Sequence, residues 1–372
     1  MVDPPQAADP AGTNRTRLVV LFGGQSAEHD VSRSSARHVL EAADPERYDI
    51  EPVAITKDGQ WLAAEEAAAA LAAGPAALPE LLPVSGPAVE PAGVLATRSA
   101  AQQTVVLPLL HGPMGEDGTV QGMLELAGVP FIGCGVLSSA LAMDKSKAKE
   151  IFAANGIPQV PWSSFREAEV REVGAEAFAT KLAGSLPFPI FVKPANMGSS
   201  IGVSKARDLP ELVAAIELAF TYDEWVVAEQ GVVAREIECA VLGNESPRAS
   251  VPGEIVTSAD FYDYEDKYFA GTAETVIPAD LDLETTAELQ ELAVRAFVAL
   301  RCEGLARVDF FFESPGRGLL LNEVNTMPGF TPISMYPQLW QASGVPYGAL
   351  VDELVQLAIE RHARRTAKRR TD

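Results

Sequence analysis

The stretch RVDFFF at residues 307–312, with LLLNEVNTMPG at 319–329 after a short turn, places ionisable side chains inside two otherwise apolar segments. Both segments are short and rich in strand-forming residues, and the Pro and Gly residues between them are typical of a turn. The pattern therefore predicts an antiparallel hairpin. A turn centred on Gly316 sets Asp309 opposite Glu323.

Four polar side chains gather in one patch of this predicted hairpin. Because side chains alternate along a strand, Arg307 shares a face with Asp309, and Glu323 shares a face with Asn325. Neighbouring buried carboxylates repel each other unless a positive charge lies between them. Two carboxylates and an amide oxygen suit Mg²⁺, which usually takes its remaining ligands from water and substrate phosphates. The hairpin thus predicts a nucleotide site, and the alternative is a surface hairpin whose charges face water.

A second informative stretch is FPIFVKPANMGSSIGV at residues 188–203, which predicts a strand, a loop and a second strand. Gly198 and Gly202 allow backbone N–H groups to approach an anion, and the two serines between them add donors. Lys193 at the end of the first strand supplies a positive charge. The stretch predicts a phosphate-covering loop that differs from the P-loop, because the Gly-x4-Gly-Lys-Ser/Thr pattern does not occur. A plain hairpin turn is the alternative.

Composition agrees with a multidomain enzyme. A chain of 372 residues, 47% of them hydrophobic, predicts about two or three domains with substantial cores. The net charge of −22 argues against nucleic acid or an anionic membrane as partners, and the basic stretch 361–370 predicts a frayed helix end. A polyanion such as ATP would then need a local basic cluster, for which the candidates are Lys145, Lys193, Lys267 and Arg307.

Neither the cysteines nor the apolar runs indicate export. Cys134, Cys239 and Cys302 are widely spaced and lack a Cys-x-x-Cys pattern, so small buried side chains in a reducing cytosol are expected. The sequence shows no signal-peptide pattern and no apolar run of about 18 residues. We therefore expect a cytoplasmic protein.

The amino-terminal part alternates predicted strands and helices. LVVLF at residues 18–22 predicts a buried parallel strand that ends at a Gly-Gly pair, and residues 32–40 predict a helix. Further strands are expected at 50–55 and 104–109, which indicates a small doubly wound sheet. The Gly-Gly pair lacks the Gly-x-Gly-x-x-Gly spacing, so no dinucleotide cofactor is expected. A further helix is predicted at 144–154.

Two polar residues follow the expected carboxyl ends of parallel strands, where open α/β sheets bind their ligands. Glu28 comes after the first strand, and His111 opens the loop HGPMGEDG at residues 111–118. Glu28 could bind a charged ligand group or be a solvated loop charge. His111 could contact a substrate, although a single histidine is more often structural.

WVVAEQGV at residues 225–232 predicts a strand that runs into a connector. The next strand, predicted at 235–242, carries Glu236 and Glu238 at alternate positions. An adenine slot needs backbone donors and acceptors with apolar walls, and a ribose needs a carboxylate. The alternative is an edge strand with exposed acids.

The aromatic and charged loop FYDYEDKY spans residues 261–268. Such a loop can cover a site, exclude water and deliver Lys267 and Tyr268 to it. The alternative is a mobile surface loop.

Together these motifs closely resemble those of D-alanine–D-alanine ligases of the ATP-grasp superfamily. They follow the family's order from about residue 17 to residue 360. Asp30, where the family often has Glu, is a mild departure. The stretches that carry the resemblance are GGQSAEHDVS at 23–32, HG at 111–112 with GEDG at 115–118, MDK at 143–145, KP at 193–194 with GSS at 198–200, YDY at 262–264 with KY at 267–268, and EVNTMPG at 323–329.

The resemblance implies an α/β (α+β) ATP-grasp fold of three domains. A Rossmann-like doubly wound sheet comes first, and two α+β domains then clasp ATP. The expected boundaries are a disordered tail at 1–15, a substrate domain at 16–142, a central ATP-grasp domain at 143–252, a catalytic ATP-grasp domain at 253–364 and a basic tail at 365–372.

The resemblance also implies a reaction. ATP phosphorylates the carboxylate of one D-alanine, and the amine of a second D-alanine attacks the acyl phosphate to give D-alanyl-D-alanine for peptidoglycan precursor synthesis. Two Mg²⁺ ions, replaceable by Mn²⁺, would neutralise the phosphoryl oxygens. The partners implied are ATP, D-alanine and a second copy of the chain in a homodimer, with neither nucleic acid nor membrane.

Residue roles follow from the family pattern. The metal ligands would be Asp309, Glu323 and Asn325, and the nucleotide would be held by Lys145, Lys193, Ser200, Glu229, Gln230, Val232, Glu236, Lys267 and Asn322. Among these, Lys145 and Lys193 would hold the α- and β-phosphates, Lys267 the γ-phosphate, Gln230 to Val232 the adenine and Glu236 the ribose. Glu28 would bind the ammonium of the first D-alanine with Ser199 and Tyr268 fixing the geometry, Arg307 and the Gly329 backbone would stabilise the oxyanion, and His111, Ser334 and Met335 would contact substrate, the last two at the second carboxylate.

Two alternatives stay open. A depsipeptide ligase would join D-alanine to D-lactate, whereas the Lys267-Tyr268 pair resembles the dipeptide-forming version. A nucleotide-binding sensor would keep the ATP site without turnover. The intact set of Arg307, Asp309, Glu323 and Asn325 disfavours a sensor.

Overall fold

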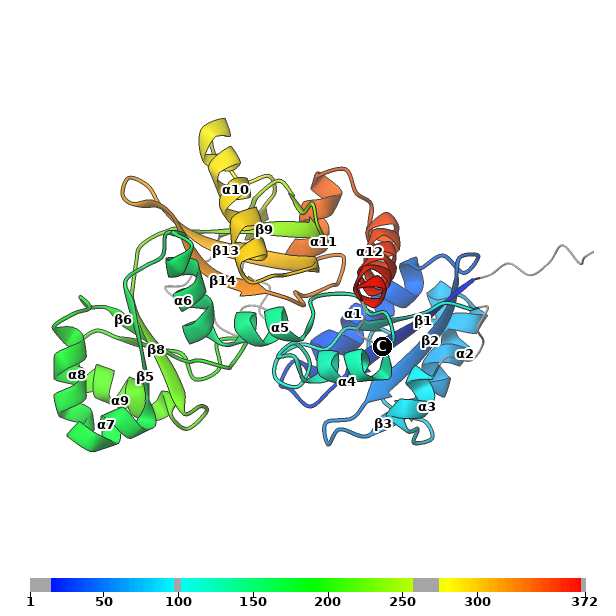
Figure 1. Cartoon of the computed structure of the whole chain (residues 1–372), viewed down its shortest axis with the longest axis horizontal. Helices are drawn as coiled ribbons and strands as arrows, with labels where there is room; N and C mark the ends of the chain where they lie inside the picture. The colour runs from blue at the N-terminus through cyan, green and yellow to red at the C-terminus, as the bar shows by residue number, and fades with distance from the viewer. Residues whose placement is uncertain (1–14, 97–101, 257–273, 369–372) are drawn as a thin grey trace, which may run out of the picture.

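The protein is described by a computed structural model that covers residues 15–96, 102–256 and 274–368. Within these residues the strands form three sheets (Figure 1). The second sheet lies at one end of the molecule, the first sheet at the other end and the third sheet between them. No helix in the described part combines the length and apolarity needed to cross a lipid bilayer.

The first sheet has the strand order β3-β2-β1-β4. Strand β1 pairs in parallel with β2 and β4, whereas β3 is antiparallel to β2. Alternate residues of β1 enter two different hydrophobic clusters, which explains its uninterrupted apolar sequence and confirms the predicted buried strand. The elements are β1 Thr16–Gly23, α1 His29–Ala42, β2 Tyr48–Ile55, β3 Trp61–Ala63, α2 Glu65–Ala73, α3 Pro91–Leu95, β4 Thr104–Pro108 and α4 Thr119–Ala127.

The second sheet is antiparallel, with the order β5-β8-β6-β7. Helices pack against the apolar residues of one face in a separate cluster. The predicted strand, loop and strand at 188–203 are confirmed, although the second strand starts at Ser204. The elements are β5 Trp162–Arg166, α7 Glu167–Val173, α8 Ala175–Ala183, β6 Ile190–Pro194, β7 Ser204–Ala206, α9 Leu209–Ala219 and β8 Trp225–Gln230.

The third sheet has the order β12-β11-β9-β13-β14, with β10 paired to β9. Because β9 lies between β11 and β13, the alternative of an edge strand at 235–242 is wrong. One face packs against α10 and α6, and the other contributes to a core shared with the first sheet. The elements are α5 Val136–Met143, α6 Lys145–Ala154, β9 Arg235–Gly243, β10 Arg248–Ala249, β11 Gly253–Val256, β12 Glu274–Val276, α10 Leu283–Ala299, β13 Gly304–Glu313, β14 Gly318–Asn325, α11 Met335–Ala342 and α12 Tyr347–Ala367.

The carboxyl-terminal helix α12 is docked rather than frayed, so that prediction is wrong up to Ala367. Arg361 is buried and donates a 2.8 Å hydrogen bond to the Phe131 carbonyl. Its guanidinium carbon also lies 4.2 Å from the centre of the Phe131 aromatic ring. Arg365 forms ion pairs with Glu125 and Glu303. The basic residues therefore join the first and third sheets.

The three cysteines are free thiols, and all three are buried. This confirms the predicted role of small core side chains.

Candidate active site

The hairpin of β13 and β14 has the predicted register. Asp309 lies opposite Glu323, and Arg307 lies opposite Asn325. Asp309 is buried and accepts a 2.8 Å hydrogen bond from the Asn325 amide, so the alternative in which its charge faces water is wrong. The register shifts directly after Asp309, which leaves Asn322 as the extra residue of a β-bulge. The fold thus brings together the three predicted metal ligands and places Asn322 next to them.

Arg307 is held by two carboxylates. Its guanidinium donates two 2.8 Å hydrogen bonds to Asp309, and its Nε lies 2.9 Å from Glu238 Oε2 on β9. Burial opposes the charge, but attraction to Asp309 and Glu238 outweighs it and raises the pKa of Arg307. Sequence reasoning gave Glu238 no role, although its alternation with Glu236 placed both on one face. The register completes a row of Glu238, Asp309 and Glu323 across three strands.

The donor set of Asp309, Glu323 and Asn325 fits a hard divalent cation. Asn325 donates its side-chain N–H to Asp309, and an amide keeps its oxygen as an acceptor when its N–H donates. Across the described ranges, no group of three or more His, Cys, Asp or Glu is arranged as a metal cage. Two carboxylates and an amide match Mg²⁺, which completes its shell with water and substrate phosphates.

Helix α6 places lysines beside this hairpin. Asp144 caps the helix by accepting a 3.0 Å hydrogen bond from the Lys147 N–H. Lys145 donates a 2.5 Å hydrogen bond to the Met197 carbonyl in the glycine-rich loop and lies 3.9 Å from Glu323. The helix start therefore links the predicted phosphate loop to the predicted metal ligands.

Glu229 on β8 forms ion pairs with two lysines. It lies 2.6 Å from Lys193 on β6 and 2.7 Å from Lys149 on α6. Burial alone would raise the pKa of Glu229, but the two ammonium groups lower it to about 2. Sequence reasoning missed Lys149, although it follows Lys145 by four residues and so shares its helix face.

A separate group of residues gathers around Glu28 at the start of α1. A Cβ atom added to Gly112 would lie 3.4 Å from Glu28 Oε2, and a Cβ atom added to Gly198 would lie 3.6 Å from the same oxygen. The loop at 111–118 and the glycine-rich loop therefore both approach Glu28. His111 Nδ1 hydrogen-bonds the Met327 carbonyl at 2.9 Å, and its buried Nε2 has no partner among the described residues. The orphaned Nε2 is available to a ligand.

The serines of the glycine-rich loop have strained backbones. Ser199 and Ser200 adopt φ values of 53° and 58°, which are uncommon for residues other than glycine. The buried Ser199 Oγ lacks a hydrogen-bond partner within the described part of the chain. Strain of this kind gathers at ligand sites, and the role of Ser199 stays a prediction.

Glu116 lies in the loop at residues 111–118, and the sequence pattern gave it no role of its own. It accepts a 2.8 Å hydrogen bond from the Gly112 N–H. Burial, and then repulsion by Glu28, raises its pKa from 4.5 to about 8. The Glu116 carboxyl therefore keeps its proton at neutral pH.

We expect Glu116→Gln to change how stability depends on pH. The folded state keeps a proton that the unfolded chain releases above pH 4.5, so the stability contributed by this group is lost as pH rises from 4.5 to about 8. The variant keeps the hydrogen-bonding shape without titrating. In urea unfolding, the free energy of unfolding of the variant relative to the wild type should be higher at pH 8.5 than at pH 6. An equal difference at both pH values would contradict the shift.

The residues predicted to contact the second carboxylate lie at the start of α11. A Cβ on Gly329 would meet Ser334 Oγ at 3.0 Å, so these two residues adjoin. Ser334 Oγ also lies 2.8 Å from Thr331 Oγ1. The side chain of Met335 is packed in the hydrophobic core, which leaves its backbone as the part able to face a ligand.

The connector after β8 joins the second sheet to the third. The Gln230 N–H donates to the Pro161 carbonyl at 2.9 Å, and the Gln230 side chain accepts a 3.2 Å hydrogen bond from Arg317. Val232 and Glu236 are half-buried along this path. Lys267 and Tyr268, with the rest of the loop at 261–268, lie outside the described residues.

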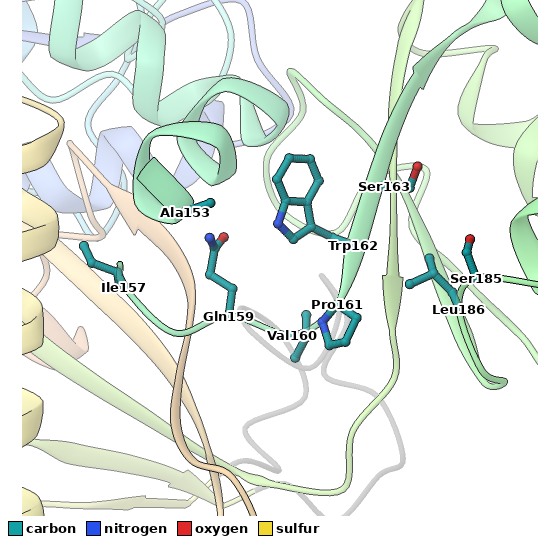
Figure 2. A pocket seen from close by; sticks show the side chains of 9 residues that line it. All are labelled: Ala153, Ile157, Gln159, Val160, Pro161, Trp162, Ser163, Ser185 and Leu186. Atoms are coloured by element: carbon teal, nitrogen blue, oxygen red, sulfur yellow. The ribbon is translucent and has the colours of Figure 1, made fainter. Parts of the chain in front are cut away.

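An open pocket of about 550 Å³ lies beside the edge strand β5 (Figure 2). Trp162 and Gln159 extend from the β5 side toward Ala153 at the end of α6. Among the described residues, none of those predicted to bind nucleotide or substrate lines this pocket. The candidate site is therefore defined by the charged side chains above and not by this hollow.

Family models cover most of the chain. Residues 17–134 match the model described as the D-ala D-ala ligase N-terminus, and residues 151–356 match the model described as the D-ala D-ala ligase C-terminus. A D-alanine–D-alanine ligase from Listeria innocua is 47% identical, and one from Listeria monocytogenes is 48% identical. Each alignment covers 95% of this chain and 98% of the relative.

Solved structures agree. The D-alanine-D-alanine ligase from Coxiella burnetii superposes with a TM-score of 0.80 at 35% identity, over 95% of this chain and 97% of that one. The VanG D-Ala:D-Ser ligase from Enterococcus faecalis gives 0.76 at 35% identity, over 92% and 99%. These structural relatives confirm the predicted ATP-grasp fold. With both family models in chain order and relatives matched along nearly their full length, this chain belongs to the D-alanine–D-alanine ligase family.

Proposed function

We propose that this protein joins two molecules of D-alanine to D-alanyl-D-alanine, with ATP converted to ADP and phosphate. The observation that carries the proposal is the intact row of Glu238, Asp309 and Glu323 with Arg307 clamped within it, in a chain of this ligase family. The dipeptide would serve peptidoglycan precursor synthesis.

The nucleotide site is proposed to lie between the second and third sheets. Lys145 and Lys193 bind the α- and β-phosphates, and Lys267 binds the γ-phosphate. Asp309, Glu323 and Asn325 would hold two Mg²⁺ ions, or Mn²⁺, which when bound neutralise phosphoryl charge. The remaining nucleotide contacts are assigned to Ser200, Gln230, Val232, Glu236 and Asn322, with Glu229 contributing its backbone.

The chemistry is proposed to proceed in two displacements. The carboxylate oxygen of the first D-alanine attacks the γ-phosphorus, and ADP leaves. The amine of the second D-alanine then attacks the acyl carbon, loses a proton and expels phosphate. Arg307 stabilises the negative oxygen that develops in the second step, because its guanidinium is already fixed by Asp309 and Glu238.

Substrate orientation is proposed to come from the cluster around Glu28. Glu28 binds the ammonium of the first D-alanine, the orphaned His111 Nε2 contacts the same substrate, and Ser199 with Tyr268 fixes the geometry. Ser334, the Met335 backbone and the Gly329 backbone receive the second D-alanine. The adjoining positions of Gly329 and Ser334 support this arrangement.

Acceptor choice is the finer part of the proposal, since a solved relative is described as a D-Ala:D-Ser ligase. We expect ADP release, coupled to NADH oxidation, to rise sharply when D-alanine is added to enzyme, ATP and Mg²⁺. Adding D-serine or D-lactate to limiting D-alanine should give little mixed product by mass spectrometry. Preferred formation of the ester with D-lactate would refute dipeptide formation. ATP turnover that ignores D-alanine would favour a sensor.

The domain division and assembly are also proposals. We propose that the boundary between the central and the catalytic domain lies in the connector at 231–234 and not at residue 252, because β9 and β11 hydrogen-bond within the third sheet. A cytoplasmic homodimer fits an ATP-consuming member of this family, and light scattering on the purified protein tests the dimer.

A further inference from the structure

Three charged side chains, two of them buried and one half-buried, connect helix α6 with two strands of the second sheet. Lys149 on α6 lies 2.7 Å from one oxygen of Glu229, and Lys193 on β6 lies 2.6 Å from the other. The side chains of Lys149 and Glu229 are only 2% and 3% exposed, whereas Lys193 is 13% exposed. Lys193 is therefore the member of this trio nearest to solvent, and Lys149 lies behind it.

The charges of the trio do not cancel. Two ammonium groups and one carboxylate leave one net positive charge, and the carboxylate divides its two oxygens between the lysines. Burial lowers the pKa of Lys149 despite the attraction of Glu229. At Lys193 burial acts in the same direction, but Glu229 outweighs it and the pKa is raised. Lys193 is thus the more firmly protonated lysine.

A purely structural role does not account for a lysine at position 149. A buried ion pair can often be replaced by well-packed apolar side chains without loss of stability, because removing charges from water is costly. The same helix face carries Lys145, which reaches Met197 and Glu323. Helix α6 lies between the second and third sheets (Figure 1), so it supplies positive charge along the proposed phosphate site.

We propose that Lys149 is a positioning residue for nucleotide binding, which neutralises one side of Glu229 so that Lys193 keeps a net positive charge for the phosphates of ATP. Lys149 itself does not touch the nucleotide. Without the Lys149 ammonium group, the whole negative charge of Glu229 is balanced by Lys193, and the two remaining charges cancel. The inference rests on the proposed phosphate-binding role of Lys193.

The test compares variants that change the net charge of the trio. Lys149→Met makes it neutral, and the double variant Lys149→Met/Glu229→Gln restores one positive charge on Lys193. We expect the single variant to weaken binding of a non-hydrolysable ATP analogue by about tenfold or more. The double variant should recover most of that affinity. Calorimetric titration measures both, and the KM for ATP should change more than the KM for D-alanine.

Two further variants serve as matched controls. Lys147→Met removes an exposed lysine of the same helix, which pairs only with Glu150 among the carboxylates of the described residues, and should leave ATP affinity unchanged. Lys149→Arg keeps the charge and should bind ATP nearly as the wild type does. If the helix merely needed a side chain of this size at position 149, Lys149→Met would bind ATP as well as Lys149→Arg does.

The outcomes separate this inference from the proposed function. Unchanged ATP affinity in Lys149→Met, or a double variant no better than the single one, overturns the inference. If Lys149→Met fails to fold, the double variant still decides, because low ATP affinity in that variant overturns it. Normal ATP affinity in Lys193→Met would instead overturn the phosphate-binding role of Lys193.

Discussion

Replacing Glu323 by Gln is expected to lower kcat by about 10²–10³-fold, the range for losing one preorganised group that stabilises transition-state charge. Glutamine keeps the size and one carbonyl oxygen but removes the negative charge that faces Asp309 across the hairpin. A site with one carboxylate less binds Mg²⁺ more weakly. The loss should therefore be partly recovered when Mg²⁺ is raised.

The measurement is steady-state ADP release over a Mg²⁺ titration, with thermal unfolding recorded for each protein. Glu291→Gln, on the exposed side of α10, changes the same charge away from the site and should leave both readings unaltered. A Glu323→Gln enzyme with wild-type kcat and Mg²⁺ dependence would remove Glu323 from the metal ligands.

Replacing Arg307 by Met is expected to abolish most turnover and to destabilise the fold. The change leaves Glu238 and Asp309, which are 6% and 8% exposed, without their shared cation. Removing one partner of a buried ion pair costs about 3–5 kcal/mol. Separately from this loss of stability, kcat should fall by a factor of about 10²–10³, because the fixed guanidinium no longer faces the developing oxyanion. Chemical denaturation and ADP release measure the two effects.

A double variant separates those effects. In Arg307→Met/Glu238→Gln the buried charge opposite Asp309 is also removed, so much of the lost stability should return. Turnover should stay low, because no cation faces the developing oxyanion. Recovery of turnover in the double variant would make Arg307 a structural residue and not a catalytic one. Arg307→Lys should fall between the wild type and Arg307→Met, since lysine keeps the charge but not the fork of two hydrogen bonds.

Sequence patterns predicted the hairpin in detail. The side-chain period of a strand is two residues and the turn is marked by Pro and Gly, so the facing of Asp309 and Glu323 follows from counting. Counting could not predict the bulge at Asn322, because it depends on how β14 fits the bend of the sheet. The same limit applies to α12, because the hydrogen bond from Arg361 to the Phe131 carbonyl joins residues far apart in the sequence.

The hairpin strands, the facing of Asp309 and Glu323 and the resemblance to the ligase family could all be predicted from the residue order, because each depends on spacing within continuous segments. Three contacts could be seen only in the folded chain: Glu238 faces Arg307, Glu116 lies beside Glu28, and Glu229 is shared by Lys149 and Lys193. Each of these contacts joins elements from separate parts of the chain. Their geometry is set by how helices and sheets pack, and no periodicity within a segment encodes that packing.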